Sequence, residues 1–167
     1  MLSLLEQKFY YFFFLINIPI STIIDSTSVI PEKYHLAPGL LNWHIRTNND
    51  FILYENDTIL KVFTAIELLF QVPFYIFATR SLLKFWKLSS MNTDEAKAAR
   101  FTLWHKLAVL MRLYGLNASS TTLYLLWQIW HRGYYPTTGL PMSPQDKLKL
   151  GLLYLPYFLL PVRLIFA

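Results

Sequence analysis

The 167-residue chain contains no cysteine, which excludes a disulfide framework, a thiol nucleophile and a thiolate metal site. Charge is also scarce, because charged residues make up 15% of the chain against about 25% in a typical soluble protein. The sequence has no glycine-rich phosphate loop, nucleophile elbow or His-Glu zinc helix. The histidines His35, His44, His105 and His131 are not spaced as metal ligands. We therefore predict no metal, no cofactor and no soluble-enzyme chemistry.

Apolar residues are abundant instead. Hydrophobic residues make up 54% and aromatic residues 17% of the sequence. Four apolar stretches predict membrane spans at about residues 6–25, 60–80, 111–131 and 148–166, each close to the ~20 residues that a spanning helix needs. We read the first stretch as a retained span and not as a cleaved signal peptide. The prediction is an all-α membrane protein, a single domain of residues 1–167 that folds as a four-transmembrane-helix bundle.

The charges between the spans predict the orientation of the bundle. Two basic residues face four acidic ones between the first and second spans, whereas seven basic residues face two acidic ones between the second and third. Basic loops stay in the cytosol, so we expect both termini on the cytosolic side. The net charge of +5 follows this topology pattern, and we expect no nucleic-acid partner.

Proline lies inside three of the four predicted spans. Each proline removes a backbone donor and frees the carbonyl group four residues earlier, which kinks a helix and leaves an acceptor for any internal cavity. Tolerance of proline in membrane helices is the simpler explanation for any one of them. Together they predict kinked helices around a cavity: Pro19, Pro73, Pro156 and Pro161.

Polar residues inside the spans predict what fills that cavity. Glu67 sits in the middle of the second span, and an acid at that depth costs about 2.5–3.5 kcal/mol on insertion scales. Gln71 lies one turn further along the same face, and Asp25 ends a stripe on the first span. Because lipid cannot satisfy these groups, we expect them to turn inward. The other predicted members are Asn17 and Ser21 on the first span, Asn117, Thr121 and Tyr124 on the third, and Tyr154 and Tyr157 on the fourth.

Two acids close together in a low dielectric do not both ionise cheaply, so one keeps its proton and donates a hydrogen bond to the other. A pair with one net negative charge suits a lipophilic amine or a sterol hydroxyl group. Simpler interpretations remain open. In these interpretations, Asp25 only caps a turn, Glu67 forms a structural hydrogen bond with Gln71 or Asn117, the tyrosines belong to an interfacial belt, or the two acids never meet.

Several sequence runs resemble the sigma-2 receptor branch of the EXPERA family. The strongest is Glu-Leu-Leu-Phe-Gln-Val-Pro-Phe at residues 67–74, together with Asn-Ile-Pro-Ile-Ser-Thr-Ile-Ile-Asp at 17–25. Val-Ile-Pro at 29–31, Leu-Leu-Asn-Trp at 40–43 and Tyr-Leu-Pro-Tyr-Phe-Leu-Leu-Pro at 154–161 keep the same order. The resemblance covers residues 16–163 and is loose over residues 97–113 and the third span.

The resemblance implies a four-helix fold in the endoplasmic reticulum membrane, a homodimer, and a cavity for sterols and amines that opens toward the bilayer. It further implies that Asp25 meets the ligand amine, that Glu67 is its protonated partner, and that Asp50 is structural. Gln71, Thr121, Tyr154 and Tyr157 match other cavity positions. The family also contains sterol Δ8-Δ7 isomerases, which carry a histidine one turn before the second-span acid, where this chain has Phe63.

These observations predict a non-enzymatic protein that binds sterols or lipophilic amines and contacts membrane lipid. It would act in sterol handling or in the trafficking and quality control of membrane-protein clients. An isomerase is the first alternative, which complementation of sterol-isomerase-deficient cells tests. A structural scaffold, whose acids only lock helices together, is the second.

Overall fold

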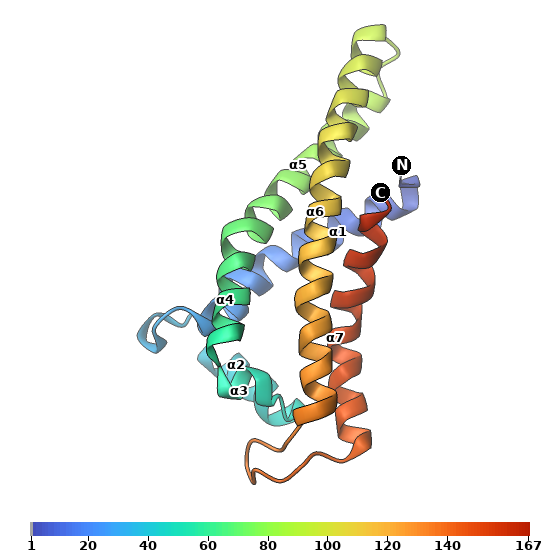
Figure 1. Ribbon diagram of the computed structural model, residues 1–167. Coiled ribbons are helices and arrows are strands. Elements are labelled where there is room, and N and C mark those ends of the chain that lie inside the picture. The colour runs from blue at the N-terminus through green and yellow to red at the C-terminus, as the bar shows by residue number, and fades with distance from the viewer. Residues whose placement is uncertain (1) are drawn as a thin grey trace.

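The computed structural model describes residues 2–167 as helices joined by short loops, with no strand in that range. The predicted all-α class is therefore confirmed (Figure 1). The α-helices are α1 (Leu4–Pro19), α2 (Pro38–Asn48), α3 (Phe51–Glu55), α4 (Thr58–Ile66), α5 (Val72–Ser89), α6 (Asp94–Arg132) and α7 (Pro144–Ile165). The π-helical turns are Ile20–Ile24 and Glu67–Gln71, and the 3₁₀ turns are Asp25–Ser28 and Glu32–Tyr34.

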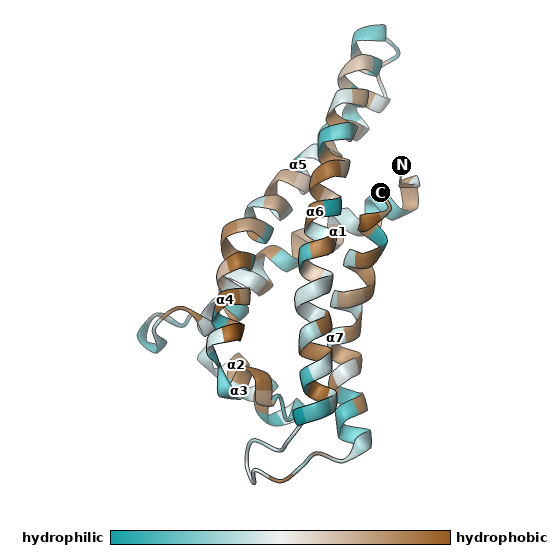
Figure 2. Ribbon diagram, viewed as in Figure 1, coloured by the Kyte–Doolittle hydropathy of each residue, from teal (hydrophilic) through white to brown (hydrophobic). Residues whose placement is uncertain are grey.

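Three helical stretches are long and apolar enough to cross a membrane: Leu4–Ser28, Thr58–Ser89 and Pro144–Ile165. Helix α6 has 39 residues, about 58 Å at 1.5 Å per residue, so its length suffices. Its polar run from Asn117 to Thr122 lowers its hydropathy, and the third predicted span, at about residues 111–131, stays a prediction. Hydrophobic residues predominate along α5 and α7, the middle of α6 is paler, and hydrophilic residues gather at the far end of the α5–α6 hairpin (Figure 2).

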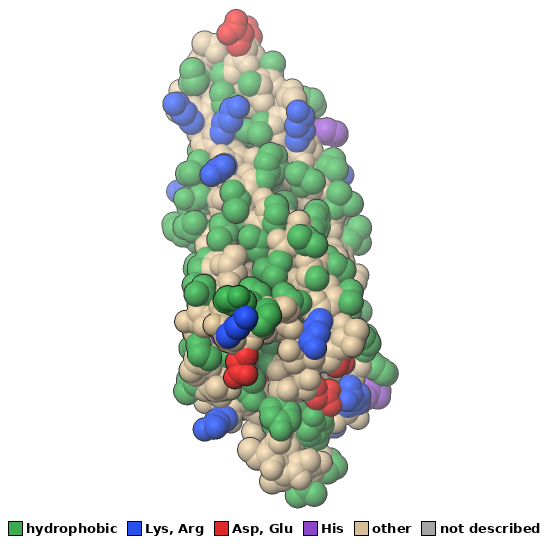
Figure 3. All heavy atoms as spheres, turned by 90° about the vertical axis from the view of Figure 1, so that its left-hand side faces the viewer, with side chains coloured by type: hydrophobic (Ala, Val, Ile, Leu, Met, Phe, Trp, Pro, Cys, Tyr) green, Lys and Arg blue, Asp and Glu red, His purple; other side chains and the backbone are tan. Residues whose placement is uncertain are grey.

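The basic segment between α5 and α6 is helical and not the loop that the sequence pattern suggests. Helix α5 continues to Ser89, and α6 begins at Asp94, where the Thr93 side chain accepts a hydrogen bond from the Ala96 amide. The resulting hairpin extends beyond both chain ends (Figure 1). Acidic side chains lie at its tip, with lysines and arginines below them (Figure 3).

Helices α6 and α7 pack closely at Gly115. A Cβ atom at this position would lie 2.6 Å from the Pro161 carbonyl oxygen, so only glycine permits the approach. Two turns further along α6, the Thr122 hydroxyl shares its one hydrogen between the Ala118 carbonyl oxygen of its own helix at 2.8 Å and the Tyr157 carbonyl oxygen at 3.2 Å. Pro161 has no amide hydrogen to offer that carbonyl. A side chain of α6 thus satisfies a backbone acceptor that a proline leaves free in α7.

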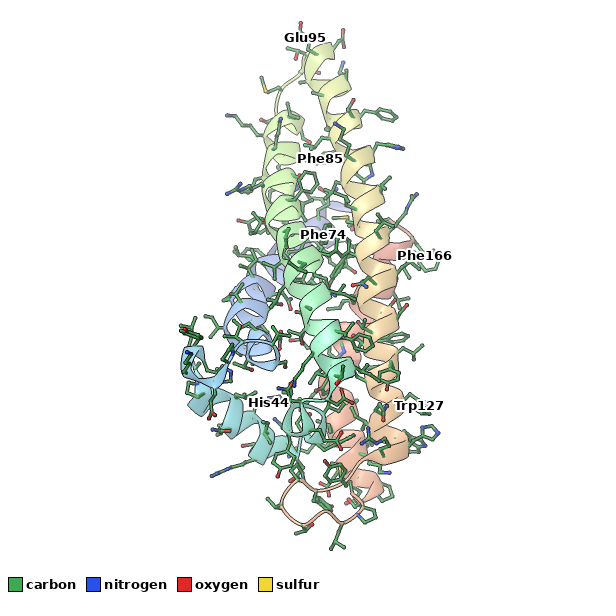
Figure 4. All side chains as sticks on the ribbon, turned by 60° about the vertical axis from the view of Figure 1, so that its left-hand side comes forward. His44, Phe74, Phe85, Glu95, Trp127 and Phe166 are labelled. Atoms are coloured by element: carbon green, nitrogen blue, oxygen red, sulfur yellow. The ribbon has the colours of Figure 1, made fainter. Side chains whose placement is uncertain are left out.

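An aromatic cluster joins α1 to α5 and α6. Phe14, Phe74, Tyr75 and Tyr114 are buried, and their ring centroids lie 4.9–6.2 Å apart. Figure 4 shows Phe74 in the interior between these helices. This cluster fixes where the end of α1 meets α4 and α5, which is where the two π-helical turns lie.

Each π-helical turn stands next to a proline. The first, Ile20–Ile24, directly follows Pro19, and its extra residue brings the Asp25 amide to the Ile20 carbonyl. The second, Glu67–Gln71, ends before Pro73, and the Val72 amide donates to the Glu67 carbonyl. Such turns are frequent at functional sites because they re-aim side chains. Pro156 and Pro161 lie inside α7, and the predicted kinks stay a prediction.

Candidate functional site

The two π-helical turns contact each other and bring two acids together. Asp25 directly follows the first turn, and Glu67 begins the second. The Ser21 hydroxyl group, which is fully buried, donates to the Glu67 carboxylate. The Asp25 carboxyl group lies beside Glu67 and Ser21 and lines the same cavity as Glu67. These three side chains form one cluster, which we call the acid cluster.

The acid cluster lies beside a partly open cavity of about 320 Å³. Of the eight residues predicted to bind a ligand, seven line this cavity, and their ligand-binding role stays a prediction: Asn17, Asp25, Glu67, Gln71, Thr121, Tyr154 and Tyr157. Ser21 stands behind the wall, where it holds Glu67. The apolar lining comes from Ile20, Ile24, Leu53, Leu60, Phe63, Leu125 and Leu153.

Gln71 belongs to a second polar group in the wall. Its amide nitrogen donates to Asn117 Oδ1 at 3.0 Å, and its amide oxygen accepts from the Tyr75 hydroxyl group at 3.0 Å. Glu67 instead pairs with Ser21 and Asp25. The latch from Glu67 to Gln71 or Asn117 is therefore not the arrangement found, and Glu67 is left to the acid cluster.

Asp50 is fully buried and joins three elements. Its Oδ1 accepts hydrogen bonds from the amides of Ile52 and Leu53, each at 3.1 Å, and so caps α3. Its Oδ2 accepts from the Tyr154 hydroxyl group of α7 at 2.8 Å and lies 3.2 Å from His44 Nε2 of α2. One carboxylate thus positions a tyrosine and a histidine of the cavity wall.

His44 is one of the cavity residues that the sequence reasoning missed. The others with polar side chains include Thr64, Tyr75, Tyr114 and Thr122. His44 lies on the inner side of α2 (Figure 4) and lines the cavity. The sequence feature that could have revealed it is the inward face of a short amphipathic helix. Leu41, His44 and Ile45 share this face. That helix lies between two membrane spans, and no long apolar run marks it.

Comparison with known proteins places this arrangement in a family. A sequence model of EXPERA, the expanded EBP superfamily, matches residues 36–167. The chain belongs to the EXPERA family. The resemblance read from the sequence motifs is confirmed, and the match includes the third and fourth predicted spans.

Individual EXPERA relatives cover nearly the whole chain. The Efficient mitochondria targeting-associated protein 19 of Saccharomyces cerevisiae is 38% identical over 166 residues, which cover 97% of this chain and 96% of the relative. The human Sigma intracellular receptor 2 is 27% identical over 159 residues, or 92% of this chain and 81% of the receptor. The Xenopus tropicalis receptor of the same name is 25% identical over 166 residues, or 97% and 86%.

Proposed function

We propose that this EXPERA protein is a non-enzymatic protein of the endoplasmic reticulum membrane that binds a sterol or a lipophilic amine in its partly open cavity. The observation that carries the proposal is the acid cluster, in which Asp25 and Glu67 meet through Ser21 at an otherwise largely apolar cavity. Buried acids inside membrane helices are costly, and a binding role explains why both face the same space.

The chemistry of the cavity defines the ligand class. Two carboxyl groups that share one proton carry one net negative charge, which attracts one ammonium group. The ring of Phe63 and the phenol of Tyr157 line the same space and favour a cation over their faces. A sterol hydroxyl group would hydrogen-bond the same carboxyl pair. The volume of about 320 Å³ falls at the lower end of the range of small-molecule pockets.

We further propose that ligand binding serves the trafficking or quality control of membrane-protein clients. Sterol handling is the alternative role. The name of the yeast relative, which concerns efficient targeting to mitochondria, supports a role in trafficking. Rescue of mitochondrial protein targeting in yeast that lacks this relative would test it. Rescue by the wild type but not by Glu67→Gln would connect the cavity to targeting, whereas rescue by both would separate them.

Binding of a radiolabelled lipophilic amine to purified protein tests the central proposal. We expect saturable binding that sterol displaces and that Asp25→Asn or Glu67→Gln abolishes, with the folded fraction unchanged. Asp57→Asn is the matched control, because Asp57 caps α4 through the Leu60 amide and lies outside the cavity. No saturable binding to folded wild type would contradict the proposal and favour the scaffold.

A sterol isomerase is the second candidate, and His44 is the observation that favours it. Isomerisation needs a proton donor and a proton acceptor at one apolar site, and the cavity holds an imidazole in addition to two acids. Complementation of sterol-isomerase-deficient cells is the test. Growth that depends on His44 would support an enzyme, and failure to complement at normal expression would count against it.

A further inference from the structure

Helix α2 has an exposed face that no part of residues 2–167 covers, and none of its residues is fully buried. Its inner side carries the partly buried Leu41, His44 and Ile45. On the outer side, Leu40 is 46% and Trp43 is 60% exposed. Leu36, which lies in a bend just before the helix, is 76% exposed and adds a further exposed apolar side chain to this segment.

A polar stripe runs beside the apolar one. Asn42 and Arg46 are exposed and lie four residues apart, so they share a second face of α2. The helix thus presents three sides in order: a side packed on the protein, an exposed apolar side, and an exposed polar side. This division is typical of helices that lie in the plane of a membrane interface.

The position of the segment identifies what covers the apolar stripe. The chain between α1 and α2 projects sideways from the bundle, and it does not reach as far as the α6–α7 connection (Figure 1). Helix α2 crosses the bundle obliquely (Figure 4). A soluble partner would approach the bundle from the ends of its long helices. The segment between α1 and α2 projects sideways next to those ends, where it faces lipid.

The residue types fit the same occupant. Tyr34 is 62% exposed, and tyrosine and tryptophan prefer the boundary between headgroups and hydrocarbon. Lys33 lies 4.8 Å from the centroid of the Tyr34 ring, and Lys33 and Arg46 have stems long enough to reach headgroups. Val29 and Ile30 are exposed where the segment leaves the first span.

We propose that residues 29–48, the anchor segment, lie in the interface of the non-cytosolic leaflet, with Leu36, Leu40 and Trp43 against acyl chains and Asn42 and Arg46 against headgroups. The proposal rests on the membrane placement in the proposed function. It makes the lipid surface a binding partner of α2. The adjoining inner side of the same helix carries His44 into the ligand cavity, so the leaflet and the cavity share one structural element.

The absence of cysteine from the sequence makes the test direct. Single cysteines at Leu36, Leu40 and Trp43 are spin-labelled in the full chain, reconstituted in lipid nanodiscs, and compared with labels at Asn42 and Arg46. We expect oxygen to collide with the first three labels more often than a water-soluble nickel chelate does. The two control labels should show the reverse preference.

A label at Leu69 tests the membrane placement independently of the anchor segment, because Leu69 is 81% exposed on the second predicted span. Suppose that the Leu69 label collides mainly with oxygen while the labels at Leu36, Leu40 and Trp43 collide mainly with the nickel chelate. That result would contradict the interfacial position of the anchor segment and leave the membrane placement intact. If Leu69 also meets the chelate, the membrane placement itself fails. Spin–spin broadening at Leu40 and Trp43 would overturn the proposal in favour of a second copy as the occupant.

Discussion

Single side chains decide how the two acids are held. Ser21 is the donor that links Glu67 to the first span, and it lies behind the cavity wall. A hydrogen bond to a charged group contributes about 1.5–3 kcal/mol. We expect Ser21→Ala to weaken binding of a lipophilic amine about tenfold or more. Ser26→Ala is the matched control, because the Ser26 hydroxyl bonds only the Thr22 carbonyl. Equal affinities of the two variants would contradict the role of Ser21.

Asp50 tests the structural side of the site. Its carboxylate accepts four hydrogen bonds and is fully buried. Removal of one partner from a buried charged network costs about 3–5 kcal/mol. We expect Asp50→Ala to lower the free energy of unfolding by about that amount. In Asp57→Ala, which removes only the cap of α4, the loss should be about 1 kcal/mol. Unfolding in detergent, followed by tryptophan fluorescence, compares them.

Seven of the polar residues that line the candidate site could be predicted, because helical spacing decides which side chains share a face. Asn17, Ser21 and Asp25 recur every four residues, and Glu67 and Gln71 do the same. Spacing did not reveal that Ser21 bonds Glu67 from behind the wall, since the π-helical turn shifts the register there. It also missed His44, whose place depends on how α2 packs against α3 and α7.

At the scale of whole elements, the packing of α6 on α7 depends on one glycine. A Cβ atom at Gly115 would lie 2.6 Å from a backbone oxygen, which cannot rotate away. We expect Gly115→Ala to lower the free energy of unfolding by about 1–3 kcal/mol. Gly151→Ala is the control, because its Cβ would meet nothing closer than 3.9 Å. A Gly115→Ala variant as stable as Gly151→Ala would show that the two helices do not approach as described.

The proline in α7 and the threonine in α6 should be energetically coupled. The Thr122 hydroxyl shares its hydrogen between the Ala118 carbonyl and the carbonyl of Tyr157, which Pro161 leaves without a backbone donor. We expect Thr122→Val to cost about 1 kcal/mol. In a Pro161→Ala background the cost should fall, since alanine restores the backbone donor. A double-mutant cycle measures this coupling, and additive effects of the two substitutions would contradict it.

Long apolar runs made the long helices predictable, because a spanning helix needs about twenty apolar residues. The short helices α2 and α3 lie in the polar segment between two such runs, where length and hydropathy carry little signal. The α5–α6 hairpin was expected as a loop from its charges. It is helical because Leu82, Phe85 and Leu107 bury apolar surface between the two helices while the lysines stay exposed.

At the scale of the whole molecule, the two chain ends lie near the same end of the bundle (Figure 1). This arrangement agrees with the expectation that both termini are cytosolic. A fragment of a split fluorescent protein, fused to either terminus, should therefore restore fluorescence with the complementary fragment in the cytosol. Fluorescence that requires the complementary fragment in the lumen, for either fusion, would contradict the predicted orientation.

The most direct test of the central claim is to locate a bound sterol. A photoactivatable sterol is crosslinked to purified protein in lipid, and mass spectrometry identifies the labelled peptides. We predict labels on the walls of the cavity, around Ile24, Phe63 and Leu153, and we predict that an excess of a lipophilic amine removes them. Labels confined to outward residues such as Leu69 and Trp127, unaffected by the amine, would contradict a ligand site at the acid cluster.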